Sequence, residues 1–406
     1  MKIRSITYFL NPGHPVNTAT FEKAAAFIAS ARPAFVRQGY QVQTTRLATP
    51  PFANWLPSLE TGLVVEAACQ LESLAHVHGA DYISLGPALP HVLQSYTVVP
   101  DVFAATRNVF LSGLLTSQER EVILPAVRAC AQVIHRASAL TQDGFANLRF
   151  AALANVQPGA PFFPAAYHQG DQPAFALATE AADLAVEAFT GASSLANARQ
   201  GLISQVESHA GRLVQVAEGL VDQFGVVFKG LDFTLAPFPE EARSIGTALE
   251  RLGVPAFGMH GSLAASAFLT DTLDQARYPR IGFNGLFLTV LEDATLAKRA
   301  AEGLLSLNEL LLYSSVCGTG LDTVPLPGNT SVDELAAILL DLAAMALRLN
   351  KPLTARLMPI PGKSAGDPTE FDFPYFANSR VLPVRARGLS GLLGGEDSFQ
   401  LDTHKG

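Results

Sequence analysis

Short runs rich in apolar and β-branched residues alternate along the chain with longer stretches whose apolar positions recur with the helical period. Runs of the first kind lie at 2–10 ("KIRSITYFL"), 40–48, 81–88, 108–115 and 148–156, and helical patterns lie at 18–38, 59–77 and 118–139. Strands that are joined by helices usually pair in parallel, with the helices covering the sheet. The first half therefore predicts an α/β fold with a mostly parallel sheet.

The second half continues this alternation. The pattern predicts a long helical region at 173–224, strands at 230–238, 280–293 and 352–362, and helices at 240–252 and 261–275. Ser331 and Glu334 have the spacing of a capping box, so a helix should begin there, preceded by a rigid loop over 317–331. With no internal repeat or linker, we expect one domain over 1–395 and a polar, frayed tail over 396–406.

Composition narrows the possible partners and the location. Apolar residues make up 49% of the 406 and charged residues only 16%, as expected of a chain with an extensive core. The net charge of −8 comes without any Lys/Arg block, which argues against nucleic acid. The most apolar segment, "LAAILLDLAAMALRL", is too short to span a membrane and carries two charges. Three scattered cysteines and no signal-peptide core indicate the cytoplasm.

Two glycine-rich segments resemble nucleotide-binding loops but fail the pattern. "PGKSAGD" lacks the first glycine of a P-loop, and "CGTGLD" lacks the third glycine of a dinucleotide fingerprint. No histidine pair has metal-ligand spacing, so we assign no metal site and leave the cofactor unknown. An oxygen-rich cation site remains an alternative for four carboxylates, Asp232, Glu292, Asp293 and Asp322, which more often cap helices or face solvent.

Two segments carry candidate chemistry. Cys317 stands in a glycine-rich turn, where neighbouring backbone amides would lower its pKa, although inert packing is the alternative. Residues 157–172, "QPGAPFFPAAYHQGDQ", form a long irregular loop that contains His168 beside several aromatic residues. That loop is either an aromatic plug over the barrel or a lid over substrate.

Five segments together carry a family resemblance: "NVQPGAPFFPAAYHQG", "FKGLDFTLAPFPEEARSIG", "NGLFLTVLEDATLAKRA", "CGTGLDTVPLPGNTS" and "RLMPIPGKSAGDPTEFDF". They resemble the DUF711 (UPF0210) family of uncharacterised proteins. The resemblance implies the fold of glycyl-radical enzymes such as pyruvate formate-lyase, a ten-stranded α/β barrel of two five-stranded halves with helices outside. In this chain "RVLPV" places Pro383 where those enzymes carry the radical glycine, so any chemistry should be polar.

These observations lead to two interpretations of function. In the first, the protein is an enzyme that acts on a small anionic metabolite inside the barrel. Its expected catalytic residues are Cys317, His168 and Asp322, and its expected substrate-binding residues are Lys229, Asp232, Glu292, Asp293 and Lys363. Arg356 lies near the same strand ends and strengthens the expectation of an anion. In the second, a non-catalytic binding or regulatory protein has kept the barrel; either form would exist as a homo-oligomer.

Overall fold

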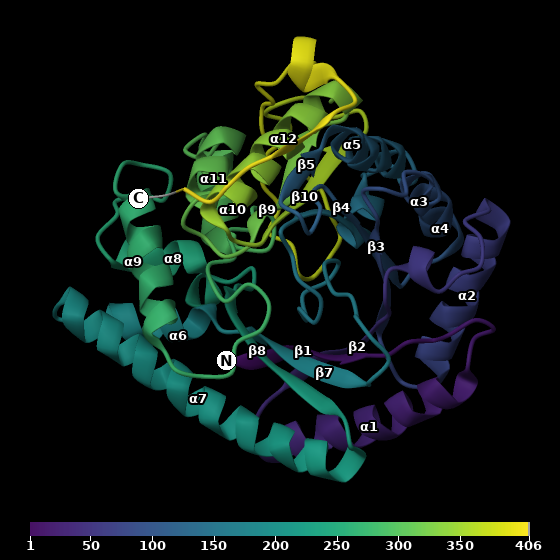
Figure 1. Ribbon diagram of the computed structural model, residues 1–406. Coiled ribbons are helices and arrows are strands. Elements are labelled where there is room, and N and C mark those ends of the chain that lie inside the picture. The colour runs from purple at the N-terminus through teal and green to yellow at the C-terminus, as the bar shows by residue number, and fades with distance from the viewer. Residues whose placement is uncertain (405–406) are drawn as a thin grey trace.

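Nine strands form one curved sheet in the computed structural model, which describes residues 1–404 (Figure 1). Their order across the sheet is β8-β7-β1-β2-β3-β4-β6-β10-β9. The bounds are β1 Lys2–Phe9, β2 Val42–Ala48, β3 Tyr82–Ala88, β4 Val109–Leu114, β6 Phe150–Ala154, β7 Ala174–Glu180, β8 Val227–Ala236, β9 Gly320–Pro327 and β10 Leu353–Ile360. Two short strands, β5 Glu121–Ile123 and β11 Ser398–Gln400, pair separately with each other. The predicted α/β class is therefore confirmed.

The sheet has a parallel centre with an antiparallel pair on each side. Strands β1, β2, β3, β4 and β6 run parallel to one another. β7 and β8 are parallel to each other but antiparallel to β1, and β9 and β10 have the same relation to β6. The sheet therefore has a parallel centre of five strands.

Helices cover the outer, convex face of the sheet, as Figure 1 shows for α1, α2, α5 and α7. Leucine, isoleucine and valine side chains that point outward from the strands pack against them in the main hydrophobic core. The helices are α1 Thr18–Arg37, α2 Thr61–Val77, α3 Gln94–Thr97, α4 Val99–Ala105, α5 Leu124–Ser138, α6 Ala182–Thr190, α7 Leu195–Phe224, α8 Ile245–Arg251, α9 Ser262–Gln275, α10 Ala294–Ala301, α11 Leu307–Ser314 and α12 Val332–Leu349. None of those in residues 1–404 combines the length and apolarity needed to cross a bilayer.

The expected ten-stranded closed barrel is not formed by regular pairing in the described residues. The segment 280–290 lies between the sheet edges β8 and β9 and makes only isolated parallel bridges, two to β8 and one to β9. Left-handed backbone at Gly282 (φ 84°) and Asn284 (φ 47°) interrupts the extended conformation that a regular strand requires. The segment predicted as a strand at 280–293 is therefore an irregular connection between the two edges.

Three other expectations are corrected. The region 173–224 is not helical throughout, because its first part forms β7, a strand buried on both faces that shows no alternation. The expected loop 317–331 contains β9, whose two prolines lie in the outermost strand of the regular sheet, where lost amide donors are tolerated. The expected frayed tail contains β11, paired with β5. The capping box of Ser331 and Glu334 is confirmed at the start of α12.

The long loop 157–172 lies inside the concave face of the sheet. Thr7 of β1 donates a hydrogen bond to the carbonyl of Pro161 (3.1 Å), and Ser84 of β3 donates one to the carbonyl of Ala166 (2.7 Å). Phe163 belongs there to a hydrophobic cluster with side chains of β1, β2, β4 and β7. The loop thus fills part of the interior, as the plug interpretation of this segment expects.

Candidate functional site

A polar cavity of about 80 Å³ opens on the concave face, at the amino-terminal ends of the parallel strands. Its strand residues alternate with core residues: Ile3 and Leu47 pack outward under the helices, whereas Arg4 and Arg46 beside them face the cavity. Its lining comprises Arg4, Gln43, Thr44, Arg46, Tyr82, Phe110, Leu148, Phe163, Glu292, Arg356, Phe373 and Tyr375. We call it the arginine cavity.

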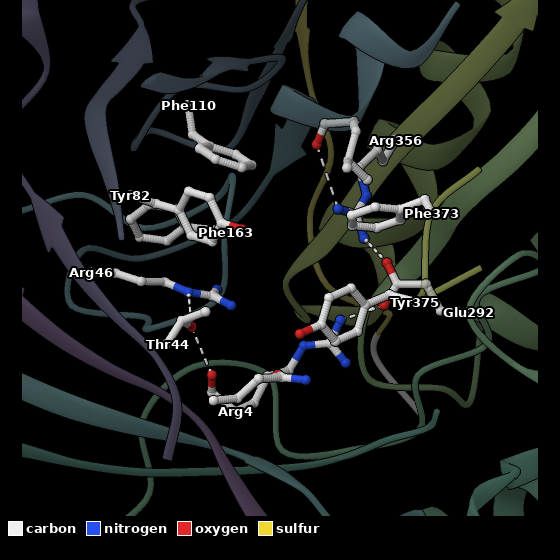
Figure 2. Close-up of a pocket in the computed structure, with 12 residues that line it drawn as sticks. Arg4, Thr44, Arg46, Tyr82, Phe110, Phe163, Glu292, Arg356, Phe373 and Tyr375 are labelled. Carbon is white, nitrogen blue, oxygen red and sulfur yellow. Dashed lines mark hydrogen bonds and ion pairs between the residues drawn. The ribbon is translucent and has the colours of Figure 1, made fainter. Parts of the chain in front are cut away.

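Figure 2 shows the arrangement of the labelled side chains. Arg46, Tyr82, Phe110 and Phe163 lie on one side, and Arg356, Glu292, Phe373 and Tyr375 lie on the other. The rings of Tyr82 and Phe110 are 5.2 Å apart between centroids, and those of Phe373 and Tyr375 also 5.2 Å. Aromatic side chains therefore bound the cavity on both sides.

Two of the three arginines are neutralised by carboxylates. Arg356 of β10 forms a bidentate pair with Asp322 of β9, from Nε to Oδ1 (2.7 Å) and from Nη2 to Oδ2 (2.5 Å). Its Nη2 also reaches Oε1 of Glu292 (2.8 Å), while Arg4 donates to the other oxygen of Glu292. This network joins β1, β9 and β10 with Glu292, which lies two residues after the 280–290 segment.

The two carboxylates respond differently to this environment. Burial acts to raise the pKa of Glu292, but Arg4 and Arg356 more than offset it, so the pKa is lowered and the group is ionised. Burial raises the pKa of Asp322 to about 6, although Arg356 favours its charged form. Asp322 is therefore the group of this network that titrates nearest to neutral pH.

Arg46 has no acidic partner. Its side chain is 8% exposed, and its Nε donates a hydrogen bond to Oγ1 of Thr44 (2.9 Å). No carboxylate in residues 1–404 lies within ion-pair distance of it. Its guanidinium lies 5.1 Å from the ring centroid of Phe163, and burial together with Arg4 lowers its pKa to about 10. The cavity therefore carries one buried positive charge that no carboxylate of the described residues pairs with directly.

The predicted site carboxylates separate into two groups. Glu292 lines the cavity and Asp322 lies directly behind it, both against Arg356. Asp232 instead binds the 280–290 segment: its oxygens accept from the amides of Phe283 and Asn284 (both 3.0 Å). Burial raises its pKa.

Asp293, which follows Glu292, also lies away from the cavity. It caps α10 through the amides of Thr295 (3.0 Å) and Leu296 (2.9 Å) and accepts hydrogen bonds from Ser244 (2.6 Å) and Ile245 (2.6 Å) at the start of α8. Burial raises its pKa. Asp293 thus joins the starts of α8 and α10.

The predicted nucleophile and proton shuttle lie in two other places. Cys317 is 1% exposed, accepts a hydrogen bond from the amide of Gly320 (3.3 Å), and adjoins a separate pocket beside Lys351. His168 is 2% exposed, stacks on Phe9, and adjoins a third pocket at the carboxyl ends of the parallel strands. Burial lowers its pKa to about 4, so its imidazole is neutral at neutral pH. The structure does not bring these two residues together.

The two predicted lysines also lie outside the arginine cavity. Lys229 is exposed on β8, and Lys363 forms an ion pair with Glu370 (2.6 Å) at the surface. No group of three or more His, Cys, Asp or Glu within residues 1–404 is arranged to hold a metal ion. The roles expected for Cys317, His168, Lys229 and Lys363 stay predictions.

Sequence reasoning missed most of the cavity, notably Arg4, Arg46 and the aromatic residues. A usable signal was present, because each arginine stands within an apolar strand run: Arg4 in "KIRSITYF", Arg46 in "VQTTRLA" and Arg356 in "LTARLMPI". A buried charged side chain is rare unless it has a partner or a ligand. Three such positions in three strands indicate one shared polar site.

Comparisons with known proteins agree with the family resemblance. The family model described as "Uncharacterised ACR (DUF711)" matches residues 1–378. A UPF0210 protein of Pyrobaculum aerophilum is 32% identical over 394 residues, which cover 90% of this chain and 87% of that protein. A UPF0210 protein of Syntrophobacter fumaroxidans is 32% identical over 364 residues, covering 83% and 78%. The chain therefore belongs to the DUF711 (UPF0210) family.

Proposed function

We propose that this protein binds a small anionic metabolite in the arginine cavity. The observation that carries the proposal is Arg46, a buried guanidinium that faces the cavity and that no carboxylate of the described residues pairs with directly. Burying an unpaired charge costs free energy, and a bound carboxylate or phosphate would offset that cost through charge-assisted hydrogen bonds. The planar guanidinium also suits bidentate binding of these groups.

The position of the cavity supports the same proposal. Its charged residues come from β1, β2 and β10 and, as Glu292, from just after the 280–290 segment, so the fold itself aligns them. Ion pairs to Glu292 and Asp322 hold Arg4 and Arg356 in place before any ligand arrives. Prearranged charges bind an anion without a further ordering cost.

Polar chemistry on the bound anion stays a prediction. Asp322 is the acid–base candidate nearest the cavity, since its pKa of about 6 permits proton exchange near neutral pH, but it reaches the cavity only through Arg356. An enzyme and a non-catalytic binding protein would both bind the anion in this cavity. Chemical conversion of a bound compound distinguishes the first interpretation from the second.

The tenth strand of the expected barrel, the cellular location and the oligomeric state are also part of the proposal. We propose that 280–290 serves as the tenth element of a pyruvate formate-lyase-like barrel, supported by its bridges to both edge strands. The cytoplasmic location and the homo-oligomer stay predictions.

Thermal unfolding with added anions tests the proposal. At constant ionic strength, acetate, succinate, phosphate and sulfate are compared with glycerol, for the native protein and for Arg46→Met. We expect stabilisation by at least one anion in the native protein and none in Arg46→Met, while Arg37→Met, which removes an exposed arginine of α1, responds like the native protein. Stabilisation by uncharged compounds alone, or an equal anion response in Arg46→Met, would overturn the proposal.

A further inference from the structure

We infer that the arginine cavity selects short-chain monocarboxylates, that is, anions with one charge and few carbon atoms. This inference rests on the proposed anion site and narrows its ligand class. It combines the charge balance of the cavity, its size and the chemistry of its walls.

The charge balance favours a single negative charge. Three guanidinium groups, those of Arg4, Arg46 and Arg356, are associated with two carboxylates, those of Glu292 and Asp322. One positive charge is left, and a monoanion neutralises it. A dianion would leave a buried net negative charge beside Glu292, which is unfavourable in surroundings of low polarity.

The size of the cavity favours a short ligand. Its volume is about 80 Å³, whereas an apolar cavity that holds one benzene ring measures about 150 Å³. A carboxylate with a short carbon chain fits this space. A benzoate ring is larger than this space and would extend beyond it.

The walls favour a carboxylate with an apolar part over an inorganic anion. The rings of Phe110 and Phe163 lie 5.4 Å apart between centroids and continue the surface beside Arg46, and Leu148 completes the lining. A carboxylate bound to Arg46 would place its carbon chain against these groups, which removes apolar surface from water. Inorganic anions lack that contribution.

A binding panel tests the inference. Dissociation constants are measured by isothermal titration calorimetry at about pH 7.5 and constant ionic strength for acetate, propionate and butyrate and for succinate, sulfate and benzoate. We expect at least one short monocarboxylate to bind about tenfold more tightly than succinate, sulfate and benzoate, and its binding to disappear in Arg46→Met.

A second variant tests the effect of cavity size separately from the effect of ligand charge. Phe373 is half-buried on a loop at the edge of the cavity, so Phe373→Ala enlarges the site with less damage than a change in the sheet. We expect benzoate to bind this variant at least fivefold more tightly than the native protein, with succinate unchanged.

The outcomes distinguish this inference from the proposed function. Tighter binding of succinate, sulfate or benzoate than of every short monocarboxylate, lost in Arg46→Met, would overturn the inference and leave the anion site intact. No Arg46-dependent binding of any anion would overturn both.

Discussion

Replacing Arg46 by methionine should make the free protein slightly more stable while it removes the response to anions. Methionine keeps an unbranched side chain of similar length but carries no charge. The predicted gain arises because the native guanidinium is buried beside another arginine, Arg4, without a carboxylate of its own. A residue that is unfavourable for the free protein and required for a ligand is typical of a binding site.

The magnitude follows from the pKa of Arg46, which burial and Arg4 lower from 12.5 to about 10. At about 1.4 kcal/mol per pH unit, this shift costs the folded state roughly 3 kcal/mol at neutral pH, where Arg46 is charged in both the folded and the unfolded chain. The variant loses one hydrogen bond to Thr44, worth about 1 kcal/mol, and a cation–π contact with Phe163 of about 0.5–1 kcal/mol. The balance is a gain of about 1 kcal/mol.

Differential scanning calorimetry provides the assay. With an unfolding entropy of about 2.1 cal/mol/K per residue, a gain of about 1 kcal/mol raises the melting temperature of a 406-residue chain by about 1 °C. Arg37→Met is the control and should change neither the melting temperature nor the anion response. A melting temperature several degrees below the native value in Arg46→Met, with the anion response retained, would refute the reasoning, because Arg46 would then be a structural support.

Three further predictions follow from individual side chains. The affinity for sulfate should rise roughly tenfold as the pH falls through about 6, because protonation of Asp322 removes a negative charge behind the cavity. The charge of sulfate itself does not change near this pH. A flat or falling affinity in titration calorimetry would contradict the prediction. Iodoacetamide should alkylate the exposed Cys69 in the native protein and Cys317 only after unfolding. Labelling of Cys317 in the native protein, detected by mass spectrometry, would contradict this expectation and support a nucleophilic role. Gly320→Ala should destabilise the protein by about 2 kcal/mol or more, because Gly320 has a φ of 100° and an added Cβ would lie 2.4 Å from a carbonyl oxygen of β10. Gly62→Ala in α2, where nothing lies near the added methyl, should be neutral or stabilising, and denaturant titration of both variants measures the difference.

Local patterns were sufficient to predict many of the elements. The helix expected at 18–38 is α1, the strand expected at 352–362 contains β10, and the capping box at Ser331 begins α12. These features depend on side-chain period and on hydrogen bonds within a few residues, so they can be read from a short window of sequence. Where a strand is buried on both faces, as β7 is, no period is visible, and the prediction of a helix was wrong.

Sequence patterns were sufficient for the family and the α/β class, and they place Arg4, Arg46 and Arg356 within apolar strand runs. They did not determine which of these charges meet. Arg4, Arg46 and Arg356 are far apart in the chain, and only the strand order and the inward-facing register bring them to one cavity. The same register gave partners to Arg4 and Arg356 and none to Arg46. Pairing between distant strands depends on the packing of the whole sheet, which is why only the tertiary structure could identify the candidate site.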